Sequence, residues 1–408
     1  MLDIKFIREN PDIVKQAAKH KNSNVDIDLV LELDEERRKL QGDLDGLNHK
    51  KKELAQARDI EGGKKLKVET ARLEKELQAL SFKLQDLLYR LPNIPTEDTP
   101  VGSDETGNQI VKTWGEKPVF DFTPKPHWEL GEALGVIDNE KAAQVSGARF
   151  TYLKGDIALM EYALVNFALS IIVKKGFKVV VPPIFIKPEV YMKMARLEPK
   201  EERYYLPADD LYLIGSAEHT LGPLHMDEIL SEKDLPKKYV AFSPALRREA
   251  GAAGKDTRGI IRLHQFHKVE MEVFSTAEDG MKEHLNLVAI EEEILQALNL
   301  PYQMILKCTG DIGDPNARGM DINTWMPGQN RFCETHTADY MTDFQARRLN
   351  TKYRKSDGET AFVHMNDATA LAIGRTIAAI MENYQTKAGT IKIPEVLKPW
   401  MMDVVEIK

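Results

Sequence analysis

Cysteine is scarce in this 408-residue chain, which contains only Cys308 and Cys333. A disulfide framework is therefore excluded and a zinc site built from cysteines is disfavoured, so we expect reduced thiols. Long hydrophobic runs are missing too. The longest, residues 162–173, is interrupted by Asn166 and Ser170 and is expected to be a buried helix, too short for a membrane span. The N-terminal sequence MLDIKFIREN carries early charges and no apolar signal core, which predicts a cytoplasmic protein with no membrane contact.

An excess of positive charge is also absent, since the formal net charge is −8. This excludes a protein that coats itself with nucleic acid, although a local basic patch would be hidden in the average. A phosphate-binding P-loop is missing as well, because GAAGKD at 251–256 lacks the first glycine's spacing and the Ser or Thr after its lysine. A chain of this length and composition has room for two or three globular domains.

Leucines repeat with heptad spacing in the N-terminal quarter of the chain. From Leu66 to Leu91 the spacing alternates four and three, and every position except Thr70 is leucine. A weaker seam of the same period runs from Leu33 to Leu54, and the sequence DIEGG at 59–63 supplies a turn between the two. The pattern predicts an antiparallel two-helix coiled-coil arm, with helices of about 28 to 32 residues.

Basic residues gather near this predicted turn and outnumber the nearby acids. They are Lys50, Lys51, Lys52, Arg58, Lys64, Lys65 and Lys67. Such a cluster suits contact with an RNA backbone, and the alternative is the solvated face of an ordinary coiled coil.

Proline and turn residues between Pro92 and Pro126 indicate a linker. From Trp128 onward, strand-like runs such as 178–183 and 237–242 mix with helical stretches such as 280–298. This mixture favours an α+β domain around an antiparallel sheet. The predicted divisions are a helical arm domain at 1–97, a linker at 98–127 and an α+β domain at 128–408.

The segment 246–272, LRREAGAAGKDTRGIIRLHQFHKVEME, combines cations, carboxylates and one aromatic ring in a strand–loop–strand pattern. Arg247 and Glu249 are two apart, so on an extended strand they would project from one face. A guanidinium there can grip phosphate oxygens, and a carboxylate can accept a hydrogen bond from an adenine amino group. Phe266 and Glu270 would share a face of the second strand, with the ring as a stacking platform. The pattern predicts an ATP site, and the alternative is a charged surface hairpin.

This segment resembles motif 2 of class II aminoacyl-tRNA synthetases, in the form found in seryl-tRNA synthetases. The resemblance extends over nearly the whole chain, from the start MLDIKFIRENPDIV through the arm to three motifs in order. Residues 175–183, KGFKVVVPP, resemble motif 1, whose helix and strand form a dimer interface in that family. The resemblance implies an antiparallel-sheet class II catalytic domain at 128–408, preceded by a tRNA-binding coiled-coil arm, in a homodimer.

The same resemblance implies individual roles at the ATP site. Arg247 would bind the α-phosphate and the substrate carboxylate, Glu249 the adenine amino group and Phe266 the adenine ring. Arg375, in the sequence that resembles motif 3, would hold the γ-phosphate, so Arg247 and Arg375 are the implied catalytic residues. The implied ATP-binding residues are Arg247, Arg248, Glu249, Phe266, Glu334, Thr337 and Arg375. Of these, Glu334 and Thr337 would also hold Mg²⁺ through oxygen ligands, and the alternative is a strand of structural polar residues.

An implied serine pocket supplies donors and acceptors that an analogue without the hydroxyl would leave unpaired. Its residues, by the resemblance, are Ser216, Ala217, Glu218, Arg247, Glu270 and Thr369. The sequence departs from the family pattern at several positions. Ser216 stands where threonine is usual, and Asn366 and Asp367 lie in HMNDATA where HTLNGS or HTLNNT is common. Asp367 thereby replaces an asparagine near the pocket.

The resemblance as a whole implies a serine–tRNA ligase. Such an enzyme would join serine and ATP to seryl-adenylate and transfer the acyl group to the 3′ end of tRNA(Ser), and also of tRNA(Sec). Two alternatives remain: a ligase that loads an amino acid onto a carrier protein, and a catalytically silent RNA-binding or coiled-coil protein. The long arm argues against the first, and the presence of Arg247, Glu249, Phe266, Glu334 and Arg375 argues against the second.

Overall fold

The computed structural model describes residues 1–57, 59–250 and 258–408. These residues divide into two compact units, Met1–Pro95 and Thr96–Lys408. Each unit has its own buried core, and each is described separately below.

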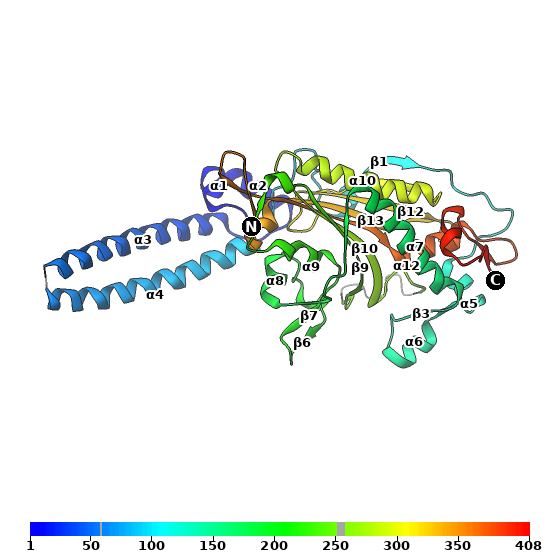
Figure 1. Cartoon of the computed structure of the whole chain (residues 1–408), viewed down its shortest axis with the longest axis horizontal. Coiled ribbons are helices and arrows are strands. Elements are labelled where there is room, and N and C mark those ends of the chain that lie inside the picture. The colour runs from blue at the N-terminus through cyan, green and yellow to red at the C-terminus, as the bar shows by residue number, and fades with distance from the viewer. Residues whose placement is uncertain (58, 251–257) are drawn as a thin grey trace. The chain divides into compact units, whose positions relative to one another are not determined.

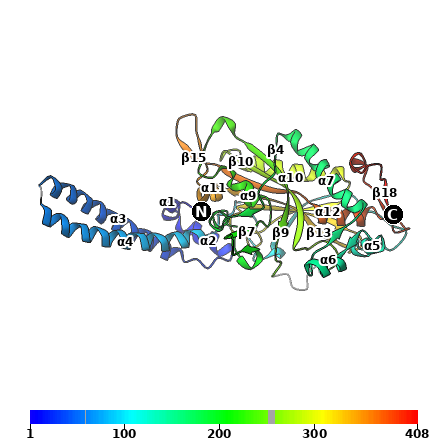
Figure 2. The ribbon, with the colours of Figure 1, turned by 60° about the horizontal axis from the view of Figure 1, so that its bottom comes forward.

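The first unit contains two short helices and two long ones. The helices are α1 (Ile4–Glu9), α2 (Pro11–His20), α3 (Ile27–Gln56) and α4 (Ile60–Arg90). Figures 1 and 2 both show α3 and α4 running side by side. Leu44 of α3 and Leu73, Leu80 and Leu84 of α4 are buried along the contact, which confirms the antiparallel coiled-coil arm predicted from the leucine seam.

The connection between α3 and α4 is shorter than the predicted turn at 59–63. Asp59 caps α4, and its carboxylate accepts a hydrogen bond from the Gly62 amide at 3.0 Å, so Gly62 and Gly63 already lie in the first helical turn. The predicted basic cluster surrounds this connection. Its described members are all exposed, namely Lys50, Lys51, Lys52, Lys64, Lys65 and Lys67. Arg58 lies outside the described residues.

The described part of the second unit is built on an eight-stranded sheet in the order β1-β11-β12-β13-β16-β10-β9-β4. Neighbouring strands are antiparallel except the edge pair β4 and β9, which is parallel. Their bounds are Gln109–Trp114 (β1), Lys178–Val180 (β4), Lys237–Leu246 (β9), Gln265–Ser275 (β10), Tyr302–Leu306 (β11), Arg318–Met326 (β12), Arg331–Thr342 (β13) and His364–Ala372 (β16). The predicted α+β fold with an antiparallel sheet is confirmed.

The segment 98–127, predicted as a linker, contributes β1 to the edge of this sheet. The side chains of β1 are exposed or partly exposed, so the strand has no alternation of buried and exposed residues. Hydrophobic periodicity, the usual signal for a strand, was therefore missing from its sequence.

Three helices share one hydrophobic core with the sheet: α7 (Asp156–Ile172), α10 (Gly280–Ala297) and α12 (Ile373–Asn383). On β10 the odd-numbered residues Val269, Met271 and Val273 enter this core. Because side chains alternate along a strand, Phe266, Lys268, Glu270 and Glu272 project from the opposite face of the sheet. That opposite face carries the candidate site.

Helix α7 and the turn that follows it, Asp156–Lys175, are long and apolar enough to cross a membrane by length and composition. The sequence argument that the run at 162–173 is too short was therefore wrong, since the helix begins six residues earlier, at Asp156. Ile157, Met160 and Leu164 are fully buried in the core, which agrees with the prediction of a buried helix.

Candidate active site

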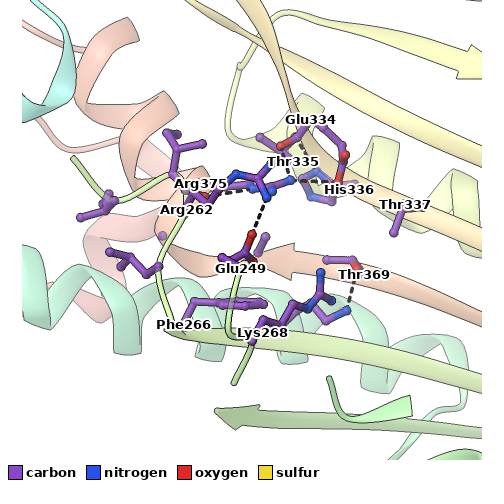
Figure 3. A pocket seen from close by; sticks show the side chains of 16 residues that line it. Glu249, Arg262, Phe266, Lys268, Glu334, Thr335, His336, Thr337, Thr369 and Arg375 are labelled. Atoms are coloured by element: carbon purple, nitrogen blue, oxygen red, sulfur yellow. Dashed lines mark hydrogen bonds and ion pairs between the residues drawn. The ribbon is translucent and has the colours of Figure 1, made fainter. Parts of the chain in front are cut away.

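A cavity lies on the face of the sheet opposite the three helices (Figure 3). Its walls come from the chain after β9, from β10, β13 and β16, and from the start of α12. The lining residues are Arg247, Glu249, Ile260, Ile261, Arg262, Leu263, Phe266, Lys268, Glu334, Thr335, His336, Thr337, Thr369, Ala372, Gly374 and Arg375. Seven residues predicted from the sequence are among them: Arg247, Glu249, Phe266, Glu334, Thr337, Thr369 and Arg375.

Arg247 and Glu249 line the cavity, although the geometry predicted for them was wrong. Strand β9 ends at Leu246, and Glu249 has φ +53°, so the two residues do not share a face of an extended strand. The Arg247 guanidinium lies over the Phe266 ring, 5.3 Å from its centroid, and its Nε donates to the Gly215 carbonyl at 3.0 Å. The cation and the ring together form one side of the cavity.

Each predicted carboxylate at the ATP side is paired with an arginine. Glu249 Oε2 accepts from Arg262 Nη1 at 2.5 Å, a contact visible at the centre of Figure 3. Arg375 Nη1 donates to Glu334 Oε1 at 2.8 Å and to its carbonyl oxygen at 2.9 Å. Desolvation opposes ionisation of Glu334, but the charge of Arg375 prevails and lowers the pKa of this carboxyl. Arg262 was not predicted, because its partner lies thirteen residues away across the loop.

Lys268 is the central residue that the sequence reasoning missed. Its Nζ lies 2.6 Å from Glu270 Oε2, 3.1 Å from Thr369 Oγ1 and 3.7 Å from Glu218 Oε2. Thr369 Oγ1 in turn donates to Glu270 Oε2 at 3.2 Å. A signal was available, since Lys268 lies midway between Phe266 and Glu270 and therefore on the same face of the strand.

The remaining predicted serine-pocket residues lie behind the cavity wall. Ser216, Ala217 and Glu218 are buried, and the Ser216 hydroxyl donates to the Glu218 carboxylate. Desolvation alone would raise the pKa of Glu218, but the charges of Lys268, His219 and Arg196 lower it. Burial raises the pKa of Glu270 to about 8 despite the contact with Lys268.

Arg248, predicted to bind ATP, does not line the cavity in the described structure. Its guanidinium lies 5.5 Å from the centroid of the Tyr204 ring, and its backbone amide donates to the Glu202 carbonyl at 3.0 Å. These contacts hold the chain that leads from Arg247 to Glu249 against residues 202–204.

The described residues contain no group of three or more His, Cys, Asp or Glu side chains placed to hold a metal ion. Glu334 offers one carboxylate and Thr337 a hydroxyl, both at the cavity. Mg²⁺ is commonly held by one or two carboxylates together with substrate phosphates. The donor set therefore fits a Mg²⁺ ion that arrives with a polyphosphate, and it does not fit a resident metal.

Comparisons with known proteins cover both units. A family model described as the seryl-tRNA synthetase N-terminal domain matches residues 1–95, and one described as the tRNA synthetase class II core domain (G, H, P, S and T) matches 204–384. Two relatives named serine–tRNA ligase, from Symbiobacterium thermophilum and Thermotoga neapolitana, are 42% and 44% identical, over 98% of this chain and 98% of theirs.

Two solved structures are similar over 100% of this chain and 99% of theirs. One is a seryl-tRNA synthetase from Pyrococcus horikoshii complexed with ATP, with a TM-score of 0.95 and 38% identity. The other is a cytoplasmic serine–tRNA ligase from Naegleria fowleri in complex with AMP, with a TM-score of 0.92 and 32% identity.

Proposed function

The chain belongs to the seryl-tRNA synthetase family of class II aminoacyl-tRNA synthetases, and from this premise we propose that it is a serine–tRNA ligase. It would join serine and ATP to seryl-adenylate and then transfer the seryl group to the 3′ end of tRNA(Ser). The observation that carries this proposal is a cavity lined by Arg247, Phe266, Arg375 and Thr369, where the Thr369 hydroxyl donates to Glu270 behind it.

Adenine would stack on Phe266, and its amino group would donate to the Glu249 carboxylate. This requires Glu249 to share or exchange its present contact with Arg262. Arg247 would bind the α-phosphate, and Arg375 would bind the γ-phosphate after turning away from Glu334. Charge-assisted bonds from guanidinium groups to phosphate oxygens are strong and geometrically specific, which favours these replacements.

Adenylate formation would need positioning and charge neutralisation and no covalent enzyme intermediate. A carboxylate oxygen of serine attacks the α-phosphorus in line, and the bond to the bridging oxygen breaks as pyrophosphate leaves. Arg247 and Arg375 would offset the charge that develops on the phosphates. Glu334 and Thr337 would hold the Mg²⁺ that accompanies ATP and neutralises phosphate charge.

Serine would be recognised through the group centred on Lys268. The Glu270 carboxylate is an acceptor suited to the ammonium and hydroxyl of serine, and the Thr369 hydroxyl lies 3.2 Å from it. Lys268 compensates the charge of Glu218, and its Nζ lies 2.6 Å from Glu270 Oε2. An amino acid without the hydroxyl would leave these groups unpaired, which supports selection of serine.

The arm would hold the tRNA, and the proposal includes tRNA(Sec) as a second substrate. The exposed lysines near the connection of α3 and α4 offer cations without neighbouring aromatic platforms, which suits contact with the RNA backbone and shape. A cytoplasmic location, where tRNA is charged for translation, belongs to the same proposal.

A homodimer is also part of the proposal. Strand β4 is an edge strand, with Val179 53% and Val181 92% exposed beside it. Tyr162 of α7 is 63% exposed. Exposed apolar side chains at a sheet edge are suited to burial against a second copy of the same surface.

The test is amino-acid-dependent exchange of pyrophosphate into ATP, with serine, threonine, alanine, glycine and cysteine compared. Serine-selective exchange followed by charging of tRNA(Ser) is the expected result. Exchange with a different amino acid would overturn the substrate. Exchange without tRNA charging would favour the carrier-protein ligase, and no exchange with any amino acid would favour the silent RNA-binding protein.

A further inference from the structure

The unusual residue Asp367 takes part in an ion pair inside the second unit. It is buried on β16 and does not line the cavity wall. Arg196 Nη2 lies 3.2 Å from Asp367 Oδ2 and 3.4 Å from Asp339 Oδ2, so one guanidinium bridges two carboxylates on neighbouring strands. Arg196 comes from the chain that follows α8 (Pro188–Lys193).

The two aspartates belong to a row of carboxylates that crosses three strands. Asp367 of β16 is in register with Glu272 of β10 on one side and with Asp339 of β13 on the other. Like charges directly opposite one another in a sheet are unfavourable. Burial and the neighbouring Asp367 raise the pKa of Glu272 well above its ordinary value, so this member is kept protonated. Burial also raises the pKa of Asp367, to about 7, and the positive charge of Arg196, whose Nη2 lies 3.2 Å from Asp367 Oδ2, opposes that rise.

This row lies next to the proposed serine pocket. On the same two strands, the pair in register two residues along is Glu270 and Thr369. These are the two groups proposed to hold the serine hydroxyl and ammonium. A displacement of β16 or β10 at Asp367 or Glu272 would therefore move the serine contacts.

Arg196 also ties the row to the segment that supports Arg247. The Arg196 carbonyl accepts from Arg203 Nε at 3.0 Å. Residues of the same segment hold the approach to the ATP side, since the Glu202 carbonyl accepts from the Arg248 amide at 3.0 Å and the Tyr204 hydroxyl bonds His264 Nδ1 at 2.9 Å. Residues 196–204 thus contact both the sheet beneath the serine pocket and the chain around Arg247.

We propose that Arg196 is a positioning residue for amino-acid recognition. Its ion pairs with Asp367 and Asp339 dock residues 196–204 onto the sheet beside Glu270 and Thr369, and this docking sets the affinity for serine. The inference rests on the proposed function and deepens it. It also gives Asp367 a role: the carboxylate in place of asparagine serves Arg196 and does not contact the substrate.

The test compares KM for serine, KM for ATP and kcat in pyrophosphate exchange. The variants are Arg196→Gln, Arg196→Lys, Asp367→Asn and the double variant Arg196→Gln/Asp367→Asn. Arg318→Gln is the control, because Arg318 is an arginine of β12 that is ion-paired at 2.8 Å to Asp98, a carboxylate outside the row that Arg196 serves. Thermal unfolding of each variant identifies any that fail to fold.

We expect Arg196→Gln and Asp367→Asn each to raise KM for serine at least about tenfold, because Arg196→Gln leaves two carboxylates without their cation and Asp367→Asn leaves Arg196 attached to the sheet through Asp339 alone. KM for ATP should rise less than KM for serine, since Arg196 reaches the chain around Arg247 only through residues 202–204, whereas its ion pair with Asp367 lies two residues from Thr369 on β16. The double variant should recover part of the serine affinity lost in Arg196→Gln, because it removes one of the two carboxylates that Arg196 serves, while Asp339 still loses its contact with the arginine. Arg196→Lys, which keeps the charge, should lie between Arg196→Gln and the wild type.

An unchanged KM for serine in folded Arg196→Gln would overturn the inference, and so would equal rises in KM for serine and for ATP. If Arg196→Gln does not fold, the inference is tested by KM for serine and KM for ATP in Asp367→Asn and Arg196→Lys. Failure of the proposed function is a separate result, visible in the wild-type enzyme as exchange with another amino acid or with none. In the former case the same comparison is made with the amino acid that is activated.

Discussion

At the scale of single residues, Lys268 sets the charge of the amino-acid side of the cavity. Burial alone would lower the pKa of Lys268, but Glu218 and Glu270 raise it, so the lysine is charged. Glu270 differs from Glu218, because burial raises its pKa to about 8. At neutral pH Glu270 therefore holds a proton that a bound ammonium group would expel.

The pH dependence of serine binding follows from this shift. We expect KM for serine to fall as pH rises from 6 to 8, by up to about tenfold per pH unit, because binding favours the ionised Glu270. Rising pH has the opposite effect on the stability of the folded protein. The pKa of Glu270 in the folded protein lies above its ordinary value of 4.5, so the contribution of Glu270 to stability is lost as pH rises from about 4.5 towards 8. Measuring KM for serine and for ATP across this range checks the prediction, and parallel changes in both constants would contradict it.

Arg247 is the residue whose loss should cost the most activity. Arg247→Ala removes the guanidinium proposed to bind the α-phosphate and the serine carboxylate, so serine-dependent exchange should fall by at least about 10²- to 10³-fold. Arg354→Ala is a control of equal chemistry at an exposed position of the same unit. Near-normal exchange by Arg247→Ala would sink the proposed assignment.

The sequence indicated that Arg247, Phe266 and Arg375 share one site, the first two by the chemistry of the segment 246–272 and Arg375 by its resemblance to motif 3, and all three line the cavity. It did not reveal the pairing of Glu249 with Arg262 or of Asp367 with Arg196. Those pairs join residues far apart in sequence, and only the packed backbone decides which charges meet. The left-handed conformation of Glu249 was equally invisible, since the sequence there reads as a continuing strand.

At the scale of elements, the arm was predictable because a heptad seam is a local, repeated signal. Of the leucines that define it, Leu73, Leu80 and Leu84 are buried, and others such as Leu66 and Leu77 are partly buried. Strand β1 was not predictable, because its residues pair with β11 through the backbone while their side chains are largely exposed. The sequence thus predicts a helix or strand correctly where side-chain burial is periodic, and it fails to predict one where burial is not periodic.

Shortening the arm should separate the two steps of the proposed reaction. Replacing residues 41–76 by a short Gly-Ser turn keeps the inner part of α3 and α4 and removes the exposed lysines. We expect serine-dependent pyrophosphate exchange to stay within about twofold, because the cavity lies entirely in the second unit, while tRNA charging falls at least about tenfold. Full charging efficiency in the shortened enzyme would assign the arm another role.

A charge reversal tests the same element without altering its length. Lys51→Glu/Lys64→Glu/Lys67→Glu should raise KM for tRNA and weaken its dependence on salt, because fewer phosphates are neutralised. The same reversal at the exposed lysines Lys387, Lys392 and Lys408 of the second unit is the matched control. An equal rise in KM for tRNA from both triple variants would show that the net charge of the protein matters and would argue against a direct tRNA contact at the arm.

At the scale of the whole molecule, the sheet has one end that a second copy could cover. We expect a mass of about 93 kDa in solution, twice the 46.3 kDa of the chain, by light scattering coupled to gel filtration. Val181→Asp should shift this mass towards that of the single chain, because it places a charge among exposed apolar residues at the β4 edge. Val119 is 96% exposed, so Val119→Asp controls for adding a charge at an equally accessible valine. A wild-type protein that remains at 46 kDa would remove the dimer from the proposal.

The two ion pairs inside the cavity, Arg262 with Glu249 and Arg375 with Glu334, have a consequence for an enzyme that works among many small anions. An arginine that is already paired with a carboxylate binds orthophosphate or sulfate weakly, because the anion must first displace the carboxylate. A small anion would contact only one of the two pairs, so its binding energy would not compensate for breaking that pair. ATP spans the cavity and can compensate both openings at once, through its base and its phosphates. The two ion pairs would thus reduce the binding of small anions to the cavity, so that phosphate and sulfate in solution would compete weakly with ATP.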